Sequence, residues 1–128
     1  MACARAPFRG MRLTSFTDYA LRTLMYLAAH REGLVTIRDI AEAHGIAKNH
    51  LTKVVHQLGI LGVVQTLRGR KGGLKLGLEP SQINLGIVVR STETDFYMAE
   101  CFDRRKNACI LTPSCALKGV LQSATEAF

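Results

Sequence analysis

Residues 36 to 77 read TIRDIAEAHGIAKNHLTKVVHQLGILGVVQTLRGRKGGLKLG, and the placement of their glycines and apolar residues predicts two helices and a hairpin. The first helix is expected to run from Thr36, where Asp39 follows at capping-box spacing, to Gly45. The second is expected over residues 47–61, ending at a glycine. Two helices joined by a short glycine-containing turn are the pattern of a helix-turn-helix.

The second of these helices has two different faces. Its apolar face, at helical spacing, is formed by Leu51, Val54, Val55 and Leu58. Its polar face is formed by Asn49, Thr52, Lys53 and His56, flanked by Lys48 and His50. Any surface helix has a polar stripe, but this one offers donors, acceptors and cations without an acidic group. Such a face suits the major groove of DNA, where a recognition helix reads base edges.

A basic hairpin is predicted directly after the helices, with strands at residues 63–67 and 74–76. Its glycine-rich turn carries three cations, Arg68, Arg70 and Lys71. Glycine allows close backbone approach, and arginine suits a narrow minor groove, although a solubilising loop has a similar composition. The chain has a net charge of +7, and no Asp or Glu lies between Glu42 and Glu79. A basic helix and a basic hairpin together predict binding to double-stranded DNA.

The sequence before this stretch predicts one more helix and an extension. A helix is expected from Phe16 to Arg31, with Ser15 and Asp18 at capping-box spacing. Residues 1–10 are expected to be an irregular N-terminal extension, and structured-looking sequence begins at Met11, an alternative start of translation.

The sequence after the hairpin predicts a linker helix over residues 83–91 and a final amphipathic helix. The apolar positions of the final helix are Leu117, Val120, Leu121, Ala124 and Phe128. Such a stripe needs a partner surface, and the family resemblance described below implies that the partner is a second copy of the chain. The predicted fold is mainly α with a small β-hairpin. A winged helix-turn-helix domain spans residues 11–78, and residues 79–128 hold the linker helix, a cysteine loop and the dimerisation helix.

Three cysteines lie between the two C-terminal helices in the pattern Cys101-x7-Cys109-x5-Cys115. Zinc sites usually contain Cys-x2-4-Cys pairs and four ligands, whereas this stretch has no such pair and no histidine. Wide, irregular spacing suits an iron–sulfur cluster whose fourth ligand comes from elsewhere. The positive charge of residues 104–106 favours thiolates. Zinc and free or redox-reactive thiols remain open from the spacing alone, and Cys3 is interpreted as incidental.

Several classes of protein are disfavoured by composition and motifs. Hydrophobic residues make up 48% of the chain, which argues against disorder. No apolar run is long enough to cross a membrane and no secretory h-region is present, so a cytoplasmic location is expected. A phosphate loop, a nucleophile motif and paired carboxylates are all missing, so an enzyme is not expected.

Independent motifs in this chain resemble one family of regulators. They are the stretch 13–22 (LTSFTDYALR), Asn49-His50-Leu51 with Lys53-Val54-Val55, Gly69-x-x-Gly72-Gly73, and the cysteine loop. In order and spacing they resemble the NsrR family of nitric-oxide-sensing repressors, which are winged-helix proteins related to IscR. The similarity covers about residues 11–128. Lys118 stands where the IscR type has a histidine, which favours the NsrR type.

The resemblance implies a bacterial, homodimeric repressor that binds palindromic operator DNA and carries one iron–sulfur cluster per subunit. The cluster would be 4Fe-4S, with 2Fe-2S as the alternative, and its reaction with nitric oxide would lower DNA affinity. Carried over by motif, its ligands would be Cys101, Cys109, Cys115 and, from the opposite subunit, Asp18.

Two alternative functions and two departures from the family pattern stand beside this hypothesis. The same cysteines would serve a regulator that responds to iron or oxidants, or, in a different class, a small electron-transfer iron–sulfur protein. The extension at residues 1–10 is unfamiliar, and more sequence is expected after Phe128, which bears on the stability of the dimer.

Overall fold

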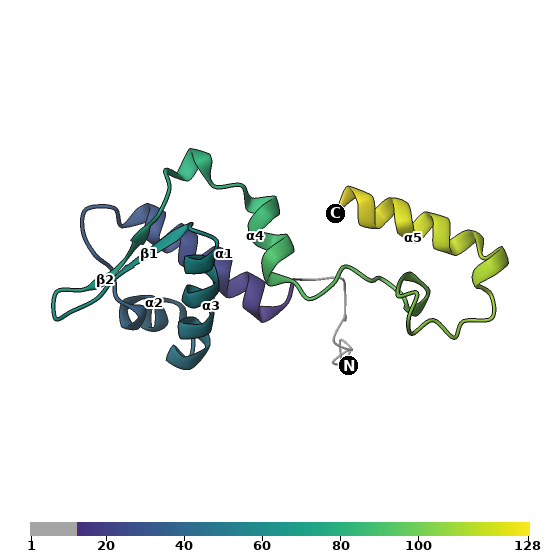
Figure 1. Cartoon of the computed structure of the whole chain (residues 1–128), viewed down its shortest axis with the longest axis horizontal. Coiled ribbons are helices and arrows are strands. Elements are labelled where there is room, and N and C mark those ends of the chain that lie inside the picture. The colour runs from purple at the N-terminus through teal and green to yellow at the C-terminus, as the bar shows by residue number, and fades with distance from the viewer. Residues whose placement is uncertain (1–12) are drawn as a thin grey trace, which may run out of the picture. The chain divides into compact units, whose positions relative to one another are not determined.

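A computed structural model describes residues 13–128, which fall into two units, residues 13–94 and a second that includes residues 95–128 (Figure 1). The helices and strands of the first unit are α1 (Ser15–Ala29), α2 (Ile37–His44), α3 (Lys48–Ile60), β1 (Val64–Leu67), β2 (Gly73–Leu76), the 3₁₀ turn η1 (Pro80–Gln82) and α4 (Leu85–Thr92). Those of the second unit are the 3₁₀ turns η2 (Glu100–Phe102) and η3 (Thr112–Ser114), and helix α5 (Ala116–Ala127). The predicted class, mainly α with a small β-hairpin, is confirmed.

Helix α2 begins and ends as the sequence predicts. The backbone N–H of Thr36 donates to the Asp39 carboxylate at 2.8 Å, and the Asp39 N–H donates to the Thr36 hydroxyl at 3.1 Å. These two hydrogen bonds form the capping box, and they hold the pKa of Asp39 below its ordinary value. The helix ends at Gly45, whose φ of 63° is a left-handed conformation that glycine adopts without strain.

The capping box predicted for α1 is wrong. Thr14 is the N-cap, and its hydroxyl accepts a hydrogen bond from the Thr17 N–H at 3.4 Å. Ser15 is already the first helical residue, so its side chain is not in the capping position. Asp18 instead forms an ion pair with Arg22, one helical turn further on.

The core of the first unit lies between α1, α2, α3, the hairpin and α4. All four residues predicted for the apolar face of α3 are buried: Leu51, Val54, Val55 and Leu58. Ala20, Leu24 and Leu27 of α1 are buried with them, and Phe16 is half-buried against this core. Val88 of α4 is fully buried in the same cluster, so α4 packs as part of this unit.

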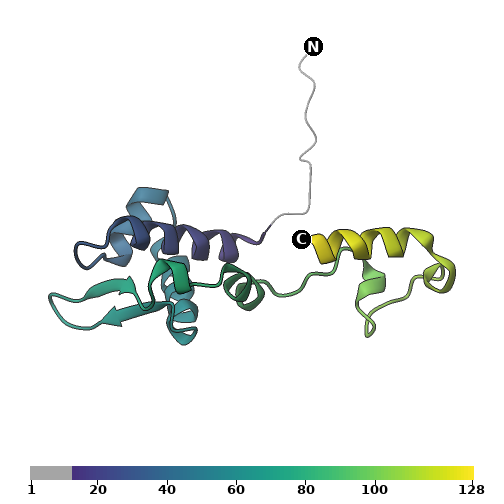
Figure 2. The same cartoon turned by 90° about the horizontal axis from the view of Figure 1, so that it is seen from above.

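The two strands form the predicted antiparallel hairpin, with Val64 opposite Leu76 and Leu67 opposite Gly73 (Figures 1 and 2). Leu74 also pairs with Val35, in the loop before α2, through two backbone hydrogen bonds. The turn between the strands is tight, because a Cβ at Gly72 would collide with the carbonyl oxygens of Leu67 and Gly69. Only glycine fits at this point of the hairpin.

The N-terminus of α1 is joined to the C-terminus of α4 by side-chain hydrogen bonds. The buried hydroxyl of Thr17 donates to the buried hydroxyl of Thr92 at 2.9 Å. Beside them, a carboxylate oxygen of Glu93 accepts from the N–H of Thr14 at 2.8 Å and from its hydroxyl at 3.1 Å. Helix α4 begins two residues later than predicted, because the side chain of Asn84 caps it by accepting from the Ile87 N–H.

The final helix, α5, leaves its apolar residues largely exposed. Leu117, Val120 and Phe128 have exposed fractions of 61%, 66% and 56%, and α5 contains no buried residue. The Phe128 ring lies near Phe96 within the same unit, with ring centroids 6.2 Å apart. No helix of residues 13–128 is long and apolar enough to cross a membrane.

Candidate nucleic-acid interface and metal site

Helix α3 presents every polar residue that the sequence analysis assigned to base reading. The exposed side chains are Lys48, Asn49, His50, Thr52, Lys53 and His56. Opposite them, the apolar face of the helix is buried in the core, so its orientation is fixed. The Thr52 hydroxyl donates to the Lys48 carbonyl at 3.0 Å, and its lone pairs stay available as acceptors. The structure thus brings the predicted base-reading residues together on one exposed helix face.

The hairpin turn presents the predicted cations. Arg68, Arg70 and Lys71 are all exposed, at the tip of the wing formed by β1 and β2 (Figure 2). Three ion pairs occur in residues 13–128, namely Arg22 with Asp18, Arg31 with Glu79, and Arg38 with Glu42. None of these pairs uses a cation of the turn or of α3. Within the described residues, the cations of the turn and of α3 are therefore not paired with a carboxylate, and they can bind an anionic partner such as a phosphate backbone.

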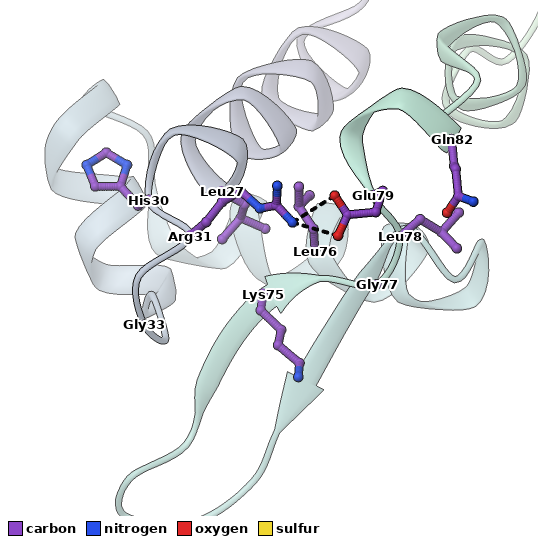
Figure 3. Close-up of a pocket in the computed structure, with 10 residues that line it drawn as sticks. All are labelled: Leu27, His30, Arg31, Gly33, Lys75, Leu76, Gly77, Leu78, Glu79 and Gln82. Atoms are coloured by element: carbon purple, nitrogen blue, oxygen red, sulfur yellow. Dashed lines mark hydrogen bonds and ion pairs between the residues drawn. The ribbon is translucent and has the colours of Figure 1, made fainter.

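A polar pocket of about 460 Å³ lies between the end of α1 and the segment that follows β2 (Figure 3). Across it, Nη2 of Arg31 donates to both carboxylate oxygens of Glu79, at 2.8 and 2.9 Å. This ion pair joins Glu79, in the segment that follows β2, to Arg31, just beyond the C-terminal end of α1. Both side chains of this pair are more than half exposed, and no sequence motif predicts a role for it.

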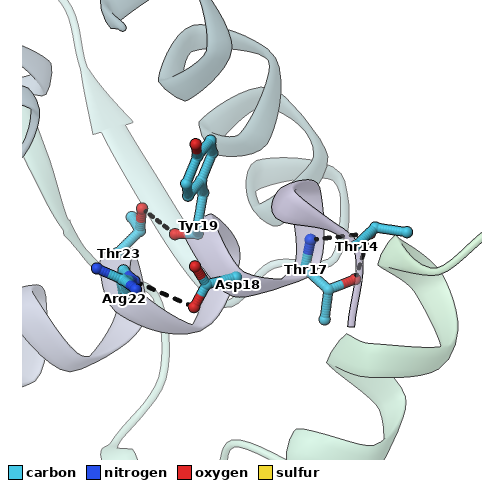
Figure 4. Close-up of polar contacts among 6 residues, drawn as sticks. All are labelled: Thr14, Thr17, Asp18, Tyr19, Arg22 and Thr23. Atoms are coloured by element: carbon cyan, nitrogen blue, oxygen red, sulfur yellow. Dashed lines mark hydrogen bonds and ion pairs between the residues drawn. The ribbon is translucent and has the colours of Figure 1, made fainter. Parts of the chain in front are cut away.

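Asp18, the predicted oxygen ligand, lies in the first turn of α1 (Figure 4). Its Oδ1 accepts a hydrogen bond from Nε of Arg22 at 3.0 Å, and its side chain is 45% exposed. A half-exposed carboxylate in an i,i+4 ion pair is held only weakly, so a cation or metal of another chain can compete for it.

The adjacent residue, Tyr19, makes a contact that the sequence analysis missed. Its ring stacks on the imidazole of His50, with centroids 6.3 Å apart and an interplanar angle of 25°. Tyr19 belongs to the motif at residues 13–22, but spacing along one helix carries no information about a partner on α3.

The three cysteines predicted to be cluster ligands lie in the second unit, each in a different local backbone structure. Cys101 lies in η2, Cys109 lies in a turn, and Cys115 immediately precedes α5. All three are free, with Cys101 and Cys115 half-buried and Cys109 exposed. Within residues 13–128, no group of three His, Cys, Asp or Glu side chains is close enough to hold a metal ion.

The turn around Cys109 is built by polar side chains. The Cys109 N–H donates to Oδ1 of Asn107 at 3.0 Å, and the Thr112 hydroxyl donates to the Cys109 carbonyl at 2.9 Å. Glu100, next to Cys101, accepts from the Ala108 N–H at 2.6 Å. These bonds tie the segment carrying Cys109 to the segment carrying Cys101. Three soft thiolate donors on one such loop fit the chemistry of an iron–sulfur cluster.

A helix-turn-helix followed by a β wing, both carrying exposed cations, defines the winged-helix class of DNA-binding proteins. Residues 13–128 match the Rrf2 family, described as an iron-dependent transcriptional regulator, and the chain belongs to this family. It is a DNA-binding transcriptional regulator and not an enzyme.

Among its relatives, the HTH-type transcriptional regulator NsrR of Bacillus subtilis (strain 168) is 55% identical over 119 residues, covering 92% of this chain and 82% of the relative. The solved structure of T. potens IscR is 28% identical and aligns with a TM-score of 0.64, covering 92% of this chain and 80% of that one. A transcriptional regulator from Listeria innocua, 24% identical with a TM-score of 0.73 over 94% of this chain and 78% of that chain, shares the fold. The resemblance to NsrR regulators that the sequence motifs indicated is confirmed.

Proposed function

We propose that the protein is a nitric-oxide-responsive repressor that binds palindromic operator DNA as a homodimer in the bacterial cytoplasm. The observation that carries this proposal is the combination, in one chain, of an exposed acid-free DNA-binding face with a separate unit bearing three free cysteines. The 55% identity to a relative named NsrR supports the choice of signal.

In this proposal, α3 enters the major groove and the wing contacts the backbone or the minor groove. Asn49, Thr52 and His56 read base edges, because amide, hydroxyl and imidazole groups both donate and accept. The cations of α3 and of the turn bind phosphates, which gives strong salt dependence. These cations are Lys48, Lys53, Arg68, Arg70 and Lys71.

The cysteine loop would hold an iron–sulfur cluster through Cys101, Cys109 and Cys115, with Asp18 of the opposite subunit as the fourth ligand. The resemblance favours 4Fe-4S, and 2Fe-2S is the alternative that iron and sulfide counts distinguish. When bound, the cluster supplies the iron that reacts with nitric oxide. The protein's part is to offer three cysteine sulfurs on a loop that also carries exposed Arg104, Arg105 and Lys106, whose positive charge would offset that of a negative cluster. Because the three cysteines are not grouped closely enough to hold a metal ion together, cluster binding would require the loop to rearrange.

The exposed apolar face of α5 would pack against a second copy of the chain. A palindromic site requires two α3 helices related by two-fold symmetry, and an isologous interface supplies that symmetry. Leu117, Val120 and Phe128 offer the apolar surface for this contact.

The test is operator binding by anaerobically purified protein, with its visible spectrum and its iron and sulfide contents measured first. Cluster-loaded protein is expected to bind the operator tightly, and cluster-free or nitric-oxide-treated protein to bind weakly, because the switch must come from different affinities of the two states. Equal affinity of loaded and cluster-free protein, with no response to nitric oxide, contradicts the proposal. A response only to iron or oxidants favours the alternative regulator. Absence of specific duplex binding at physiological salt favours an electron-transfer protein.

A further inference from the structure

The stack of Tyr19 on His50 joins α1 to the recognition helix at the end that reads DNA. His50 is the third residue of α3, and side chains at the N-terminus of a recognition helix reach base edges. Tyr19 is half-buried, whereas His50 is exposed on the predicted DNA face. A centroid separation of 6.3 Å with nearly parallel planes lies within the range of favourable aromatic pairs.

The rings of Tyr19 and His50 are both attached to backbone that the core holds in place. Ala20 follows Tyr19 and Leu51 follows His50, and both of these neighbours are fully buried in the core. The carbonyl of Tyr19 also accepts a 2.7 Å hydrogen bond from the buried hydroxyl of Thr23 (Figure 4). The Tyr19 side chain also packs against the buried core, so its ring is held in place and restricts where the exposed imidazole can go.

This contact differs from the other histidine stack of α1. Tyr26 stacks on His30 with centroids 4.1 Å apart, but His30 lies just beyond the end of the same helix. Among the aromatic contacts found in residues 13–128, only the pair of Tyr19 and His50 reaches α3. Tyr26 also meets His44 of α2 edge-on, with ring centroids 5.8 Å apart. It thus provides a control of the same residue type on the same helix, against histidines that do not lie on α3.

We propose that Tyr19 is a positioning residue for DNA recognition, which holds the His50 imidazole in the orientation that reads the operator. This inference rests on the proposed function, in which α3 enters the major groove. It also connects Asp18 to the DNA face by a short path, one peptide bond to Tyr19 and then the ring stack on His50. Asp18 and Tyr19 are consecutive residues, so a shift of the α1 backbone at Asp18 moves the ring that orients His50.

The experiment compares Tyr19→Leu, Tyr19→Phe and Tyr26→Leu in the cluster-loaded dimer, using operator and random duplexes of equal length. Tyr19→Leu is expected to lower the ratio of operator to random affinity by roughly two- to tenfold, the size of a lost aromatic pair. Affinity for random DNA should not change, because no phosphate contact is removed. Tyr19→Phe keeps the ring and should keep the ratio, and Tyr26→Leu should keep it as well.

Two further measurements separate positioning from general destabilisation. Thermal unfolding of each variant shows whether Tyr19→Leu and Tyr26→Leu lose similar stability. The double variant Tyr19→Leu with His50→Gln should discriminate no worse than His50→Gln alone, because Tyr19 acts through His50.

The proposal is overturned if Tyr19→Leu keeps the wild-type ratio, if Tyr26→Leu loses as much, or if the losses of Tyr19→Leu and His50→Gln multiply. A wild-type protein that does not prefer an operator contradicts the proposed function instead. The ratio of loaded to cluster-free affinity should fall in Tyr19→Leu if the path from Asp18 contributes to the switch, while the cluster spectrum stays unchanged. A changed spectrum would place the effect at the metal site and overturn the positioning role.

Discussion

Thr17 donates a hydrogen bond to Thr92 across 75 residues of sequence, hydroxyl to hydroxyl at 2.9 Å, and both side chains are buried. Thr92 in turn donates to the carbonyl of Val88, one turn earlier in α4. This chain of hydrogen bonds fastens the first turn of α1 to the last turn of α4. A buried hydroxyl without a partner is costly, so the pair specifies how the two helices meet.

Replacing Thr92 by valine is expected to destabilise the protein by about 1–3 kcal/mol, because the buried hydroxyl of Thr17 loses its acceptor. Adding Thr17→Val should recover part of this loss, since both partners are then apolar and of similar shape. Urea denaturation of the two single variants and the double variant gives the coupling energy. Costs that simply add would show that the two hydroxyls do not interact.

The capping box of α2 predicts a pH dependence of stability. In the folded state the pKa of Asp39 is lowered, chiefly by the hydrogen bond from the Thr36 N–H and secondly by the contact with the Thr36 hydroxyl. A lowered folded pKa gives stability that is present above the unfolded pKa and is lost as the pH falls through the folded pKa. Asp39→Asn should therefore be less stable than wild type at neutral pH, and the difference should shrink below about pH 4. Thermal unfolding across this range measures it, and a constant difference at all pH values would contradict the assignment.

The wing is expected to depend on Gly72. In Gly72→Ala the new Cβ meets the backbone of Leu67, Arg68 and Gly69, so the turn must open and its cations move. Operator affinity should fall on the order of tenfold, as expected when a few phosphate contacts are lost. Gly33→Ala is the control, because a Cβ there has no neighbouring atom within 4 Å. Quantitative gel-shift titration compares the two, and equal affinity of both variants would remove the wing from DNA binding.

Lys71 and Asn49 are expected to differ in how they contribute to binding. Lys71→Ala should weaken operator and random duplexes about equally and reduce the slope of log affinity against log salt by about 0.9. Asn49→Ala should instead reduce discrimination at particular base pairs by about 1–3 kcal/mol each. Binding to operator variants over a series of salt concentrations separates the two effects. Equal losses on operator and random DNA for Asn49→Ala would exclude it from base reading.

Asp18 is expected to serve the cluster of the opposite subunit, and mixed dimers test this. One subunit carries Asp18→Ala with intact cysteines, and the other carries Cys101, Cys109 and Cys115 all changed to alanine. Ligation across the dimer leaves one complete site in this heterodimer, whereas ligation within a chain leaves none. Iron content and the visible spectrum are compared with those of the Asp18→Ala homodimer. If the heterodimer holds no more cluster than that homodimer, the cross-subunit role is excluded.

The local sequence rules predicted those parts of the fold that depend on local chemistry. The capping box at Thr36, the turn at Gly45 and the apolar face of α3 all follow from short-range spacing, and all are confirmed. The cap of α1 was assigned one residue too late, because Thr14 and Ser15 are both good N-cap residues and spacing alone does not choose between them.

Contacts between distant residues could not be read from the sequence. The stack of Tyr19 on His50, the pair of Arg31 and Glu79 and the bond of Thr17 to Thr92 each depend on how helices pack. No periodicity within one helix encodes its partner on another. The cluster ligands and the base-reading roles stay predictions, because they involve a metal, a second subunit and DNA.

A carboxylate oxygen of Glu93 accepts hydrogen bonds from the N–H and the hydroxyl of Thr14, so the two ends of the 13–94 unit meet at one corner. In Figures 1 and 2 this corner lies at the end of the unit opposite the wing tip. In mechanical terms, a force on the segment after α4 enters the unit at this corner. A pull on that segment loads first the bonds of Glu93 to Thr14 and, directly behind them, the buried bond of Thr17 to Thr92. These bonds end at the cap and first turn of α1, the turn that carries Asp18, so a force on that segment acts directly on the part of the helix that bears the predicted cluster ligand.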